Sequence, residues 1–209
     1  MTAVIFAAGE YYPSDELYIP DGAYVIAADA GLNKLNELGI TPDLIIGDFD
    51  SLGYTPKGNV RIYPSRKDDT DTALAVKTAI EYGFDSIIIY GGLGGERFDH
   101  AVSNIEVTEY AASKGARAYL VSNGQTVTAI RNGKAEFSSG KSGYISVMAL
   151  AGTARGVSIK GLSYTADGIT LEPTDTLGTS NMFTGNEAEI SVEDGILTLI
   201  YRGGGRDIA

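Results

Sequence analysis

The first part of the chain alternates between short apolar runs and amphipathic stretches. The apolar runs have the length of strands and cover residues 2–8, 24–28, 44–46, 60–63, 86–90 and 118–121. Between several of them the spacing of apolar residues predicts helices over 31–38, 72–82 and about 98–114. Continuously apolar strands separated by helices favour a parallel sheet that is covered on both faces. We therefore expect an α/β domain with a mainly parallel sheet over residues 1–130.

The pattern changes after about residue 125. Apolar runs at 144–150, 157–159, 169–171, 188–192 and 196–201 are short and rich in β-branched residues, and turn-forming residues separate them. The sequence offers no amphipathic helix of useful length in this part. Such spacing predicts an all-β sandwich or barrel of about 80 residues. We place the boundary within residues 125–141 and take 131–209 as the second domain.

Composition narrows the chemistry that is open to the protein. The chain has 209 residues, of which 44% are hydrophobic, and its net charge of −11 argues against a nucleic-acid partner held by phosphate contacts. It contains no Cys and one His, so any divalent ion must be held by oxygen atoms. No apolar run approaches the length of a secretory leader or a membrane span. We expect a cytoplasmic protein with no membrane partner.

Polar residues and glycines gather where five of the predicted strands end. They are Asp29, the pair Asp48 and Asp50, the run 67–71, the glycines of 91–95, and the run 122–125. In open, Rossmann-like parallel sheets, ligands bind at the carboxyl ends of the strands. Any one of these strand ends could be an ordinary turn or helix cap, but five of them together predict a binding site.

The pair Asp48 and Asp50 is the more specific signal. Residues two apart in an extended segment point to the same side, so the pair would direct two carboxylates at one spot. Like charges at such a distance repel unless a cation lies between them, and Asp71 on the next strand end could supply a third oxygen ligand. Mg²⁺ is typically held by one or two carboxylates together with water and substrate phosphates. The alternative is a solvated acidic turn.

The run GGLGGERFDH, residues 91–100, leads from a strand into a helix. Glycines let backbone amides at a helix N-terminus approach phosphate oxygens, and Arg97 adds a forked cation. The run matches neither the P-loop pattern nor the G-x-G-x-x-G dinucleotide pattern, because Arg97 stands in the place of the third glycine. His100 by itself is more typical of a structural residue at a helix start than of a base.

Several segments together resemble the bacterial thiamine pyrophosphokinases (thiamine diphosphokinases). ADAGLNKLNELGITPDLIIGDFDSL, KDDTDTALAV and GGLGGERFDHAVSNI occur in the order and spacing of that family, and LGTSN at 177–181 matches its short C-terminal motif. The resemblance covers nearly the whole chain. It implies a nucleotide-binding α/β domain, a β-sandwich that helps to hold thiamine, and a homodimer whose active sites form between subunits. The implied reaction transfers the pyrophosphoryl group of ATP to the thiamine hydroxyl and releases AMP.

Carried over position by position, the resemblance implies the following site residues. Mg²⁺ would be held by Asp48, Asp50 and Asp71. ATP would be bound by Asp29, Gly31, Asn33, Lys67, Gly91, Gly92, Gly94, Arg97, Asn123 and Gln125. Thiamine would be bound by Asp99, His100, Tyr164, Ser180 and Asn181, with Tyr164 standing where animal enzymes place a tryptophan. The catalytic group would be Asp71, Arg97 and Asp99, with Asp99 accepting a hydrogen bond or a proton from the attacking hydroxyl.

Three other interpretations remain open at this point. A pyrophosphokinase for another heterocyclic alcohol, such as a hydroxymethyl pterin, would share the N-terminal motifs and differ only in the C-terminal pocket. A non-catalytic nucleotide sensor would be expected to lack one of the acidic residues, and all of them are present. An acidic Ca²⁺-binding β-protein would not explain why the acids gather at the α/β strand ends.

Overall fold

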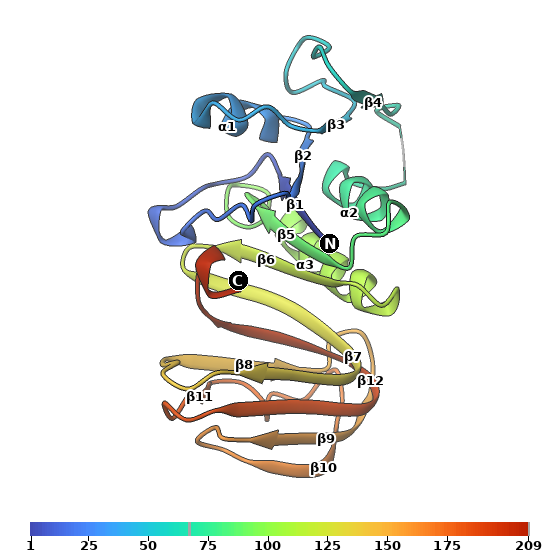
Figure 1. The fold of residues 1–209 in the computed structure, drawn as a ribbon. Coiled ribbons are helices and arrows are strands. Elements are labelled where there is room, and N and C mark those ends of the chain that lie inside the picture. Colours follow the sequence, from blue (N-terminus) through green and yellow to red (C-terminus); the bar gives the residue numbers. More distant parts are fainter. Residues whose placement is uncertain (67, 209) are drawn as a thin grey trace.

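The computed structural model describes residues 1–66 and 68–208. In the first half of the chain, strands and helices alternate (Figure 1). The strands are β1 (Thr2–Phe6), β2 (Tyr24–Ala28), β3 (Leu44–Gly47), β4 (Val60–Ile62), β5 (Ser86–Tyr90) and β6 (Arg117–Ser122). The helices are α1 (Gly31–Leu38), α2 (Asp71–Glu81) and α3 (Phe98–Ser113). Each element begins and ends within about two residues of its predicted range, because its apolar residues recur with the regular spacing of a helix or a buried strand.

These strands form a parallel sheet in the order β4-β3-β2-β1-β5-β6. One face packs against α2 and α3 around a core that includes Ile5, Ile26 and Val76. The other face packs against α1 around Phe6 and Leu35. The predicted parallel sheet with both faces covered is confirmed. Because parallel strands share a direction, their carboxyl ends lie at one edge of the sheet.

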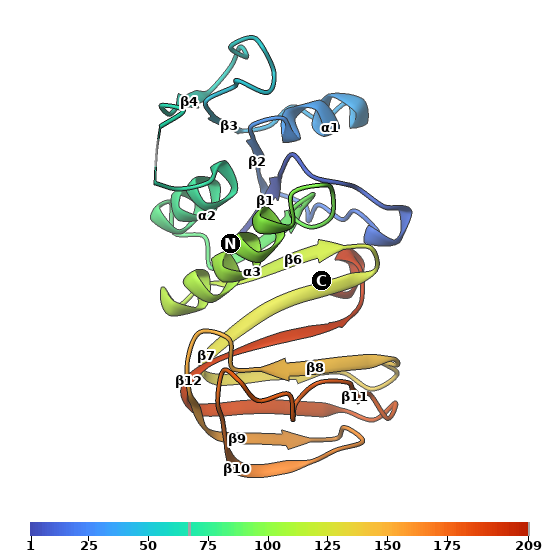
Figure 2. The same ribbon diagram turned by 180° about the vertical axis from the view of Figure 1, so that it is seen from behind.

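The second half consists of antiparallel strands around a separate core. They are β7 (Gln125–Phe137), β8 (Tyr144–Met148), β9 (Ala154–Lys160), β10 (Ala166–Leu171), β11 (Asn181–Met182) and β12 (Ala188–Arg202). As predicted, no α-helix occurs among the described residues of this half. Figure 2 shows these strands below the helical half, with the long strands β7 and β12 leading from one half into the other. Both halves belong to one continuous mixed sheet, which the sequence pattern does not predict.

The region 125–141, where the sequence places the domain boundary, is largely strand β7. This strand pairs with β6 in the first half and with β12 in the second. The sequence misses it because Asn132 and Gly133 have the composition of a turn. The strand instead continues past Asn132, whose φ is 45° and whose Oδ1 accepts a hydrogen bond of 2.9 Å from the Gly195 amide at an irregularity in β12. The division at residues 130 and 131 stays a prediction.

The C-terminal segment returns to the first half of the chain (Figure 1). The short 3₁₀ turns η1 (Pro13–Asp15) and η2 (Gly205–Ile208) come from opposite ends of the sequence. A Cβ at Gly205 would lie 1.9 Å from the hydroxyl of Tyr90 on β5 and 2.9 Å from the carbonyl oxygen of Glu16, the residue after η1, so η2 packs closely against the first half. Within the described ranges, no helix has both the length and the apolarity that crossing a membrane requires.

Candidate active site

A cavity of about 550 Å³ opens at the carboxyl ends of the parallel strands. Its walls come from the segments that follow β1, β2, β3 and β5, from the loop before α2 and from the first turns of α3. The polar residues that line it include Asp29, Asp48, Asp68, Asp69, Asp71, Arg97, His100 and Asn104. Strand ends that are far apart in the sequence therefore contribute polar groups to one cavity, as the topology of a parallel sheet requires.

Two of the three aspartates that the sequence analysis assigns to a metal line this cavity. Asp48 follows β3, and Asp71 is the first residue of α2. Asp50 is not a lining residue, and its Oδ2 accepts a hydrogen bond of 2.7 Å from the Ser65 hydroxyl. In the part of the chain that the structure describes, no three acidic or histidine side chains lie close enough together to hold a metal ion. The three-carboxylate centre is therefore not preformed.

Asp29 presents a buried carboxylate to the same cavity. It follows β2, is 7% exposed and has a φ of 47°, in the left-handed region. Its Oδ1 is buried and has no hydrogen-bond partner among the described residues. A buried carboxylate oxygen is costly unless a hydrogen-bond donor or a cation faces it. The acidic oxygen atoms at this edge of the sheet fit a hard divalent cation such as Mg²⁺.

The glycine-rich loop after β5 forms another part of the wall. Gly91, Gly92 and Gly94 all line the cavity, as the sequence predicts for phosphate-binding glycines. Gly91 has a φ of 68°, and a Cβ there would lie 2.6 Å from the Tyr11 ring. Gly94 has a φ of 83°, and a Cβ there would lie 2.7 Å from the Tyr12 hydroxyl. At both positions the φ value would strain any other residue, and at Gly91 a Cβ would also lie 2.7 Å from the backbone carbonyl oxygen of Ala7.

Arg97 and Asp99 form a two-pronged ion pair at the start of α3. Arg97 Nε and Nη2 donate hydrogen bonds of 2.9 and 2.6 Å to the two carboxylate oxygens of Asp99. This guanidinium lowers the pKa of Asp99 to about 2. Asp99 is therefore charged at neutral pH and can accept a hydrogen bond from a hydroxyl. That Asp99 also takes up a proton from that hydroxyl stays a prediction.

Several residues that the sequence analysis assigns to the nucleotide do not line this cavity. Gly31 is buried at the start of α1, and a Cβ there would lie 1.9 Å from the carbonyl oxygen of Phe6, so close packing accounts for this glycine. Asn33 is exposed on α1. Lys67 lies outside the described residues.

Asn123 and Gln125 line a different cavity, of about 580 Å³, between the turn from β6 to β7 and strand β8. Asn123 has a φ of 51°, and its amide donates a hydrogen bond of 2.5 Å to the fully buried carboxylate of Asp15. Its backbone therefore has a structural role in joining this turn to η1. Tyr144 and Ser146 from β8 complete the wall on the side of the second half.

The residues assigned to thiamine divide between the two halves. His100 lines the α/β cavity, whereas Tyr164, Ser180 and Asn181 belong to the β-strand half and do not line it. Tyr164 is 69% exposed, while Asn181 is 4% exposed. The amide of Ser180, a residue with a φ of 61°, donates a hydrogen bond of 3.1 Å to Ser146 Oγ. Within one chain, the structure does not bring these two groups into one cavity.

The Asn181 side chain is occupied by backbone groups. Its Oδ1 accepts hydrogen bonds from the amides of Tyr164, at 3.0 Å, and Met182, at 2.8 Å. Its Nδ2 donates a hydrogen bond of 2.7 Å to the Tyr164 carbonyl. Asn181 therefore fixes the segment that presents the exposed Tyr164 ring, a role that the motif by itself does not indicate.

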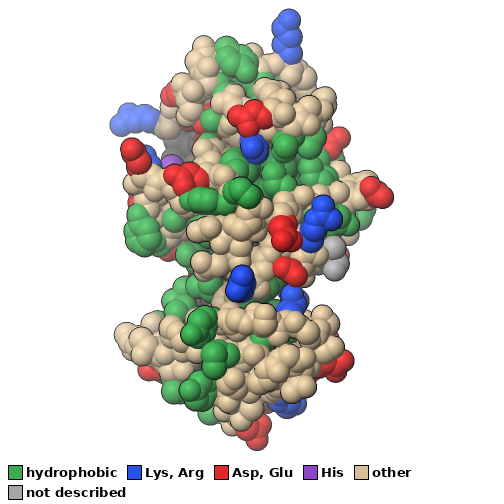
Figure 3. Space-filling view, turned by 90° about the vertical axis from the view of Figure 1, so that its left-hand side faces the viewer, with side chains coloured by type: hydrophobic (Ala, Val, Ile, Leu, Met, Phe, Trp, Pro, Cys, Tyr) green, Lys and Arg blue, Asp and Glu red, His purple; other side chains and the backbone are tan. Residues whose placement is uncertain are grey.

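Exposed hydrophobic side chains accompany Tyr164 on the β-strand half. Tyr144, Leu150, Tyr164 and Leu177 are between 45% and 75% exposed. Figure 3 shows hydrophobic side chains gathered along one edge of the lower half, below a narrow waist that separates it from the upper half.

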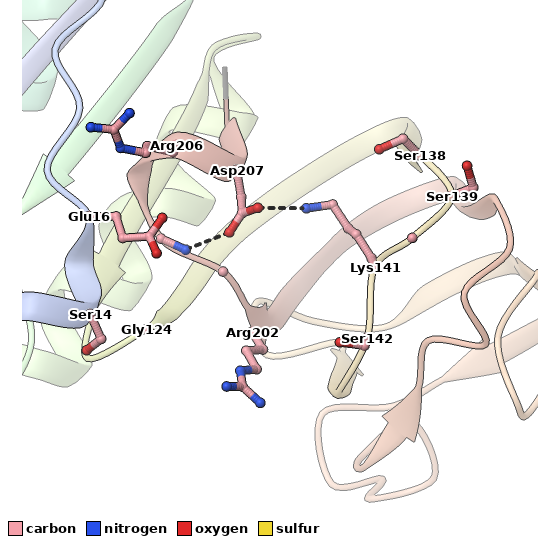
Figure 4. A pocket seen from close by; sticks show the side chains of 13 residues that line it. Ser14, Glu16, Gly124, Ser138, Ser139, Lys141, Ser142, Arg202, Arg206 and Asp207 are labelled. Carbon is pink, nitrogen blue, oxygen red and sulfur yellow. Dashed lines mark hydrogen bonds and ion pairs between the residues drawn. The ribbon is translucent and has the colours of Figure 1, made fainter.

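A further cavity, of about 610 Å³, lies between the C-terminal segment and the loop after β7. None of the predicted site residues lines it. In Figure 4, Lys141 points toward Asp207, with Nζ 3.8 Å from Oδ1, while Arg202 and Arg206 extend in different directions. The cationic side chains do not converge on one point, so this cavity offers no focused anion site.

Among the residues that line the α/β cavity, sequence reasoning gave no role to Asn104 and included Asp69 only as part of the run 67–71. Asn104 lies four residues after His100, and that spacing on α3 predicts that both share a helix face. Asp69 belongs to the acidic run before α2, and its Oδ1 accepts a hydrogen bond of 2.6 Å from Lys77 Nζ. The helical period could have indicated Asn104, whereas the pairing of Asp69 with Lys77 depends on how the loop folds back.

Two family models of known proteins match two successive parts of the chain. Residues 16–120 match the family model described as thiamin pyrophosphokinase, catalytic domain, and residues 134–197 match thiamin pyrophosphokinase, vitamin B1 binding domain. A curated relative, the thiamine pyrophosphokinase of Bacillus subtilis (strain 168), is 26% identical over 191 residues, which cover 88% of this chain and 89% of the relative.

Solved structures of thiamin pyrophosphokinases are also similar to this chain. The crystal structure of thiamine pyrophosphokinase from Bacillus subtilis has a TM-score of 0.85 at 26% identity, and the match covers 97% of this chain and 99% of that one. Thiamin pyrophosphokinase from Candida albicans has a TM-score of 0.75 and 16% identity over 96% of this chain and 88% of that one, a likeness of fold alone.

The fold, the polar cavity and these matches define an enzyme of the transferase class. Because the catalytic-domain model alone spans half of the sequence, the chain belongs to the thiamin pyrophosphokinase family.

Proposed function

We propose that this protein transfers the pyrophosphoryl group of ATP to the hydroxyl group of thiamine, which yields thiamine diphosphate and AMP. The main support for this proposal is the cavity at the carboxyl ends of the strands, where acidic side chains, the glycine-rich loop and Arg97 come together. Such a transfer needs positioning and charge neutralisation of phosphates more than covalent chemistry by the protein. We interpret the first half as a Rossmann-like nucleotide-binding unit of a cytoplasmic enzyme.

In this proposal the glycine-rich loop and Arg97 bind the phosphate chain of ATP. Backbone groups of Gly91, Gly92 and Gly94 can approach phosphate oxygens closely because no side chain intervenes. Arg97 supplies a forked cation, and its pairing with Asp99 fixes the direction of the guanidinium. Asp99, which stays charged, accepts a hydrogen bond from the thiamine hydroxyl and so orients it for attack.

Mg²⁺ would be held by Asp48, Asp50 and Asp71, with phosphate oxygens completing the coordination. The partly assembled carboxylates are compatible with this role, because Mg²⁺ usually takes only one or two protein carboxylates and several water or phosphate oxygens. When bound, the ion would neutralise the developing charge on the phosphates. Asp50 would have to exchange its hydrogen bond with Ser65 for the ion. Asp29, whose Oδ1 is buried without a hydrogen-bond partner among the described residues, would face the nucleotide and its ion.

We propose further that the protein works as a homodimer in which one chain supplies the α/β cavity and its partner supplies Tyr164 and Ser180. Two facts favour this arrangement. Tyr164 and Ser180 do not line the α/β cavity of their own chain. The Tyr164 ring is also 69% exposed, and an aromatic face attracts the cationic thiazolium ring of thiamine.

The reaction is tested by incubating the protein with thiamine, ATP and Mg²⁺ and separating the nucleotide products. AMP formed together with thiamine diphosphate supports the proposal, and ADP or inorganic phosphate refutes it. A hydroxymethyl pterin in place of thiamine tests the alternative acceptor. Asp71→Asn serves as the inactive control, because Asp71 lies in the cavity.

The shared site is tested by mixing two variants that fail in different halves. Asp71→Asn damages the α/β cavity, and Tyr164→Lys sets a cation against the thiazolium ring. Random exchange of subunits between inactive homodimers would restore about a quarter of the intact sites if each site uses two chains. Absence of recovery after verified subunit exchange would show that each chain works alone.

A further inference from the structure

The side chain of Asn104 holds the glycine-rich loop from inside the protein. Asn104 lies on α3, lines the α/β cavity and is 6% exposed. Its Nδ2 donates a hydrogen bond of 2.6 Å to the carbonyl oxygen of Gly92. The bond therefore links α3 to the glycine-rich loop, which connects β5 to the start of α3.

This bond is placed where the loop leaves its strand. Before it, the loop is held by the Gly9 amide, which donates a hydrogen bond of 2.8 Å to the Gly91 carbonyl. After it, residues 93–96 make no hydrogen bond with any other described residue. Gly94 and Gly95 have φ values of 83° and 82°, in a region that glycine visits freely, so the loop has little stiffness of its own. Asn104 is therefore the last hydrogen-bonded anchor of the loop, and beyond it the partly buried Leu93 packs against the core.

We propose that Asn104 is a positioning residue that fixes the glycine-rich loop in the conformation that receives the phosphate chain of the nucleotide. The inference rests on the proposed function for its ligand, and on the Asn104–Gly92 bond for its mechanism. Asn104 acts through the loop backbone. An ordered loop binds phosphates without first losing conformational freedom, which raises affinity.

Two variants and one matched control test this role. Asn104→Ala removes the donor, and Asn104→Asp keeps the volume but places a carboxylate oxygen against the Gly92 carbonyl. The control is Thr108→Val, one helical turn further along α3. Thr108 is fully buried, and its hydroxyl donates a hydrogen bond of 2.7 Å to the Ile105 carbonyl of the same helix. The control therefore removes one hydrogen bond from α3 without touching the loop.

Backbone ¹⁵N NMR relaxation of the unliganded protein gives a readout that is independent of the reaction. Both Asn104 variants should lower the order parameters of the Gly92 and Leu93 amides from the range of ordered backbone, about 0.85, to below about 0.6, while Thr108→Val leaves them unchanged, because the last hydrogen-bonded anchor of the loop is lost. Wild-type order parameters in both Asn104 variants would overturn the inference, whether or not the protein makes thiamine diphosphate.

Kinetics give the second readout. Both Asn104 variants should raise the KM for ATP about tenfold, with the KM for thiamine changed by less than about twofold. Equal rises in both KM values, or the same rise in Thr108→Val, would mean a general weakening of α3 and would overturn the inference. Failure of the wild-type protein to form AMP from ATP and thiamine would refute the proposed function, and the order parameters of the loop would still decide the role of Asn104.

Discussion

Replacing Asn181 by alanine removes the hydrogen bonds that its side chain makes to the backbone of the β-strand half. The amide oxygen accepts from the amides of Tyr164 and Met182, and the amide nitrogen donates to the Tyr164 carbonyl, at distances between 2.7 and 3.0 Å. Asn181 is 4% exposed, so water has poor access to the positions that its side chain leaves. We therefore expect Asn181→Ala to destabilise the fold in addition to any effect on thiamine.

The magnitude follows from the number of lost bonds. A typical intramolecular hydrogen bond contributes about 1 kcal/mol net to stability, so three of them predict a loss of about 3 kcal/mol in the free energy of unfolding. Asn181→Asp keeps the acceptor oxygen, but it loses the donor and sets a charged carboxylate oxygen against the Tyr164 carbonyl, so its loss should be at least as large. Asn186 is an exposed asparagine in the same half whose side-chain amide donates a hydrogen bond to Thr184. Asn186→Ala should therefore change stability by less than about 0.5 kcal/mol.

Urea denaturation followed by far-UV circular dichroism measures these differences, and a constant m-value would show that the midpoints report stability alone. Asn181→Ala and Asn181→Asp should both lose several times more stability than Asn186→Ala. If Asn181→Ala unfolds at the wild-type midpoint, the hydrogen bonds to the Tyr164 segment contribute nothing to stability, and the structural role assigned to Asn181 is wrong.

Three further predictions concern residues of the proposed active site. Asp71→Asn should abolish most turnover at saturating Mg²⁺ while thermal unfolding stays within a few degrees of wild type, and near-normal kcat would remove Asp71 from the metal site. Tyr164→Ala should raise the KM for thiamine about tenfold and leave the KM for ATP unchanged, whereas Tyr164→Phe should leave both KM values unchanged. If the two variants have the same KM for thiamine, stacking of the thiazolium ring on Tyr164 is excluded. Arg97→Gln should raise the pKa of Asp99 from about 2 toward its ordinary value of 3.8, because the guanidinium favours the charged carboxylate. Carboxyl NMR titration measures this pKa, and an unchanged value would contradict the ion pair.

The sequence was sufficient where structure depends on short-range periodicity. Alternation of apolar runs with helical spacing located the helices and the parallel strands of the first half, because burial on two faces requires continuous apolar strands. It also predicted that Asp29, Asp48 and Asp71 meet at one edge, since parallel strands place their carboxyl ends together. Topology is enough for that conclusion, and side-chain detail is not needed.

Local patterns failed where pairing between distant segments decides the conformation. Asn132 and Gly133 have turn composition, yet β12 pairs along both sides of them and keeps β7 continuous. At this site, hydrogen bonds to residues remote in sequence outweigh a local preference of about 1 kcal/mol.

The chemistry of individual side chains was likewise decided by the tertiary structure. Residue type made Asp99 a candidate acceptor, and the two hydrogen bonds from Arg97, which lower its pKa to about 2, decide that it is charged. Residue type made Asn181 a candidate ligand contact, but burial commits its amide to the backbone of Tyr164. The sequence by itself determined which groups reach the edge of the sheet, because strand direction follows from the hydrophobic pattern. Only the tertiary structure decided what each group can do there, because protonation and hydrogen bonding depend on the neighbours that folding supplies.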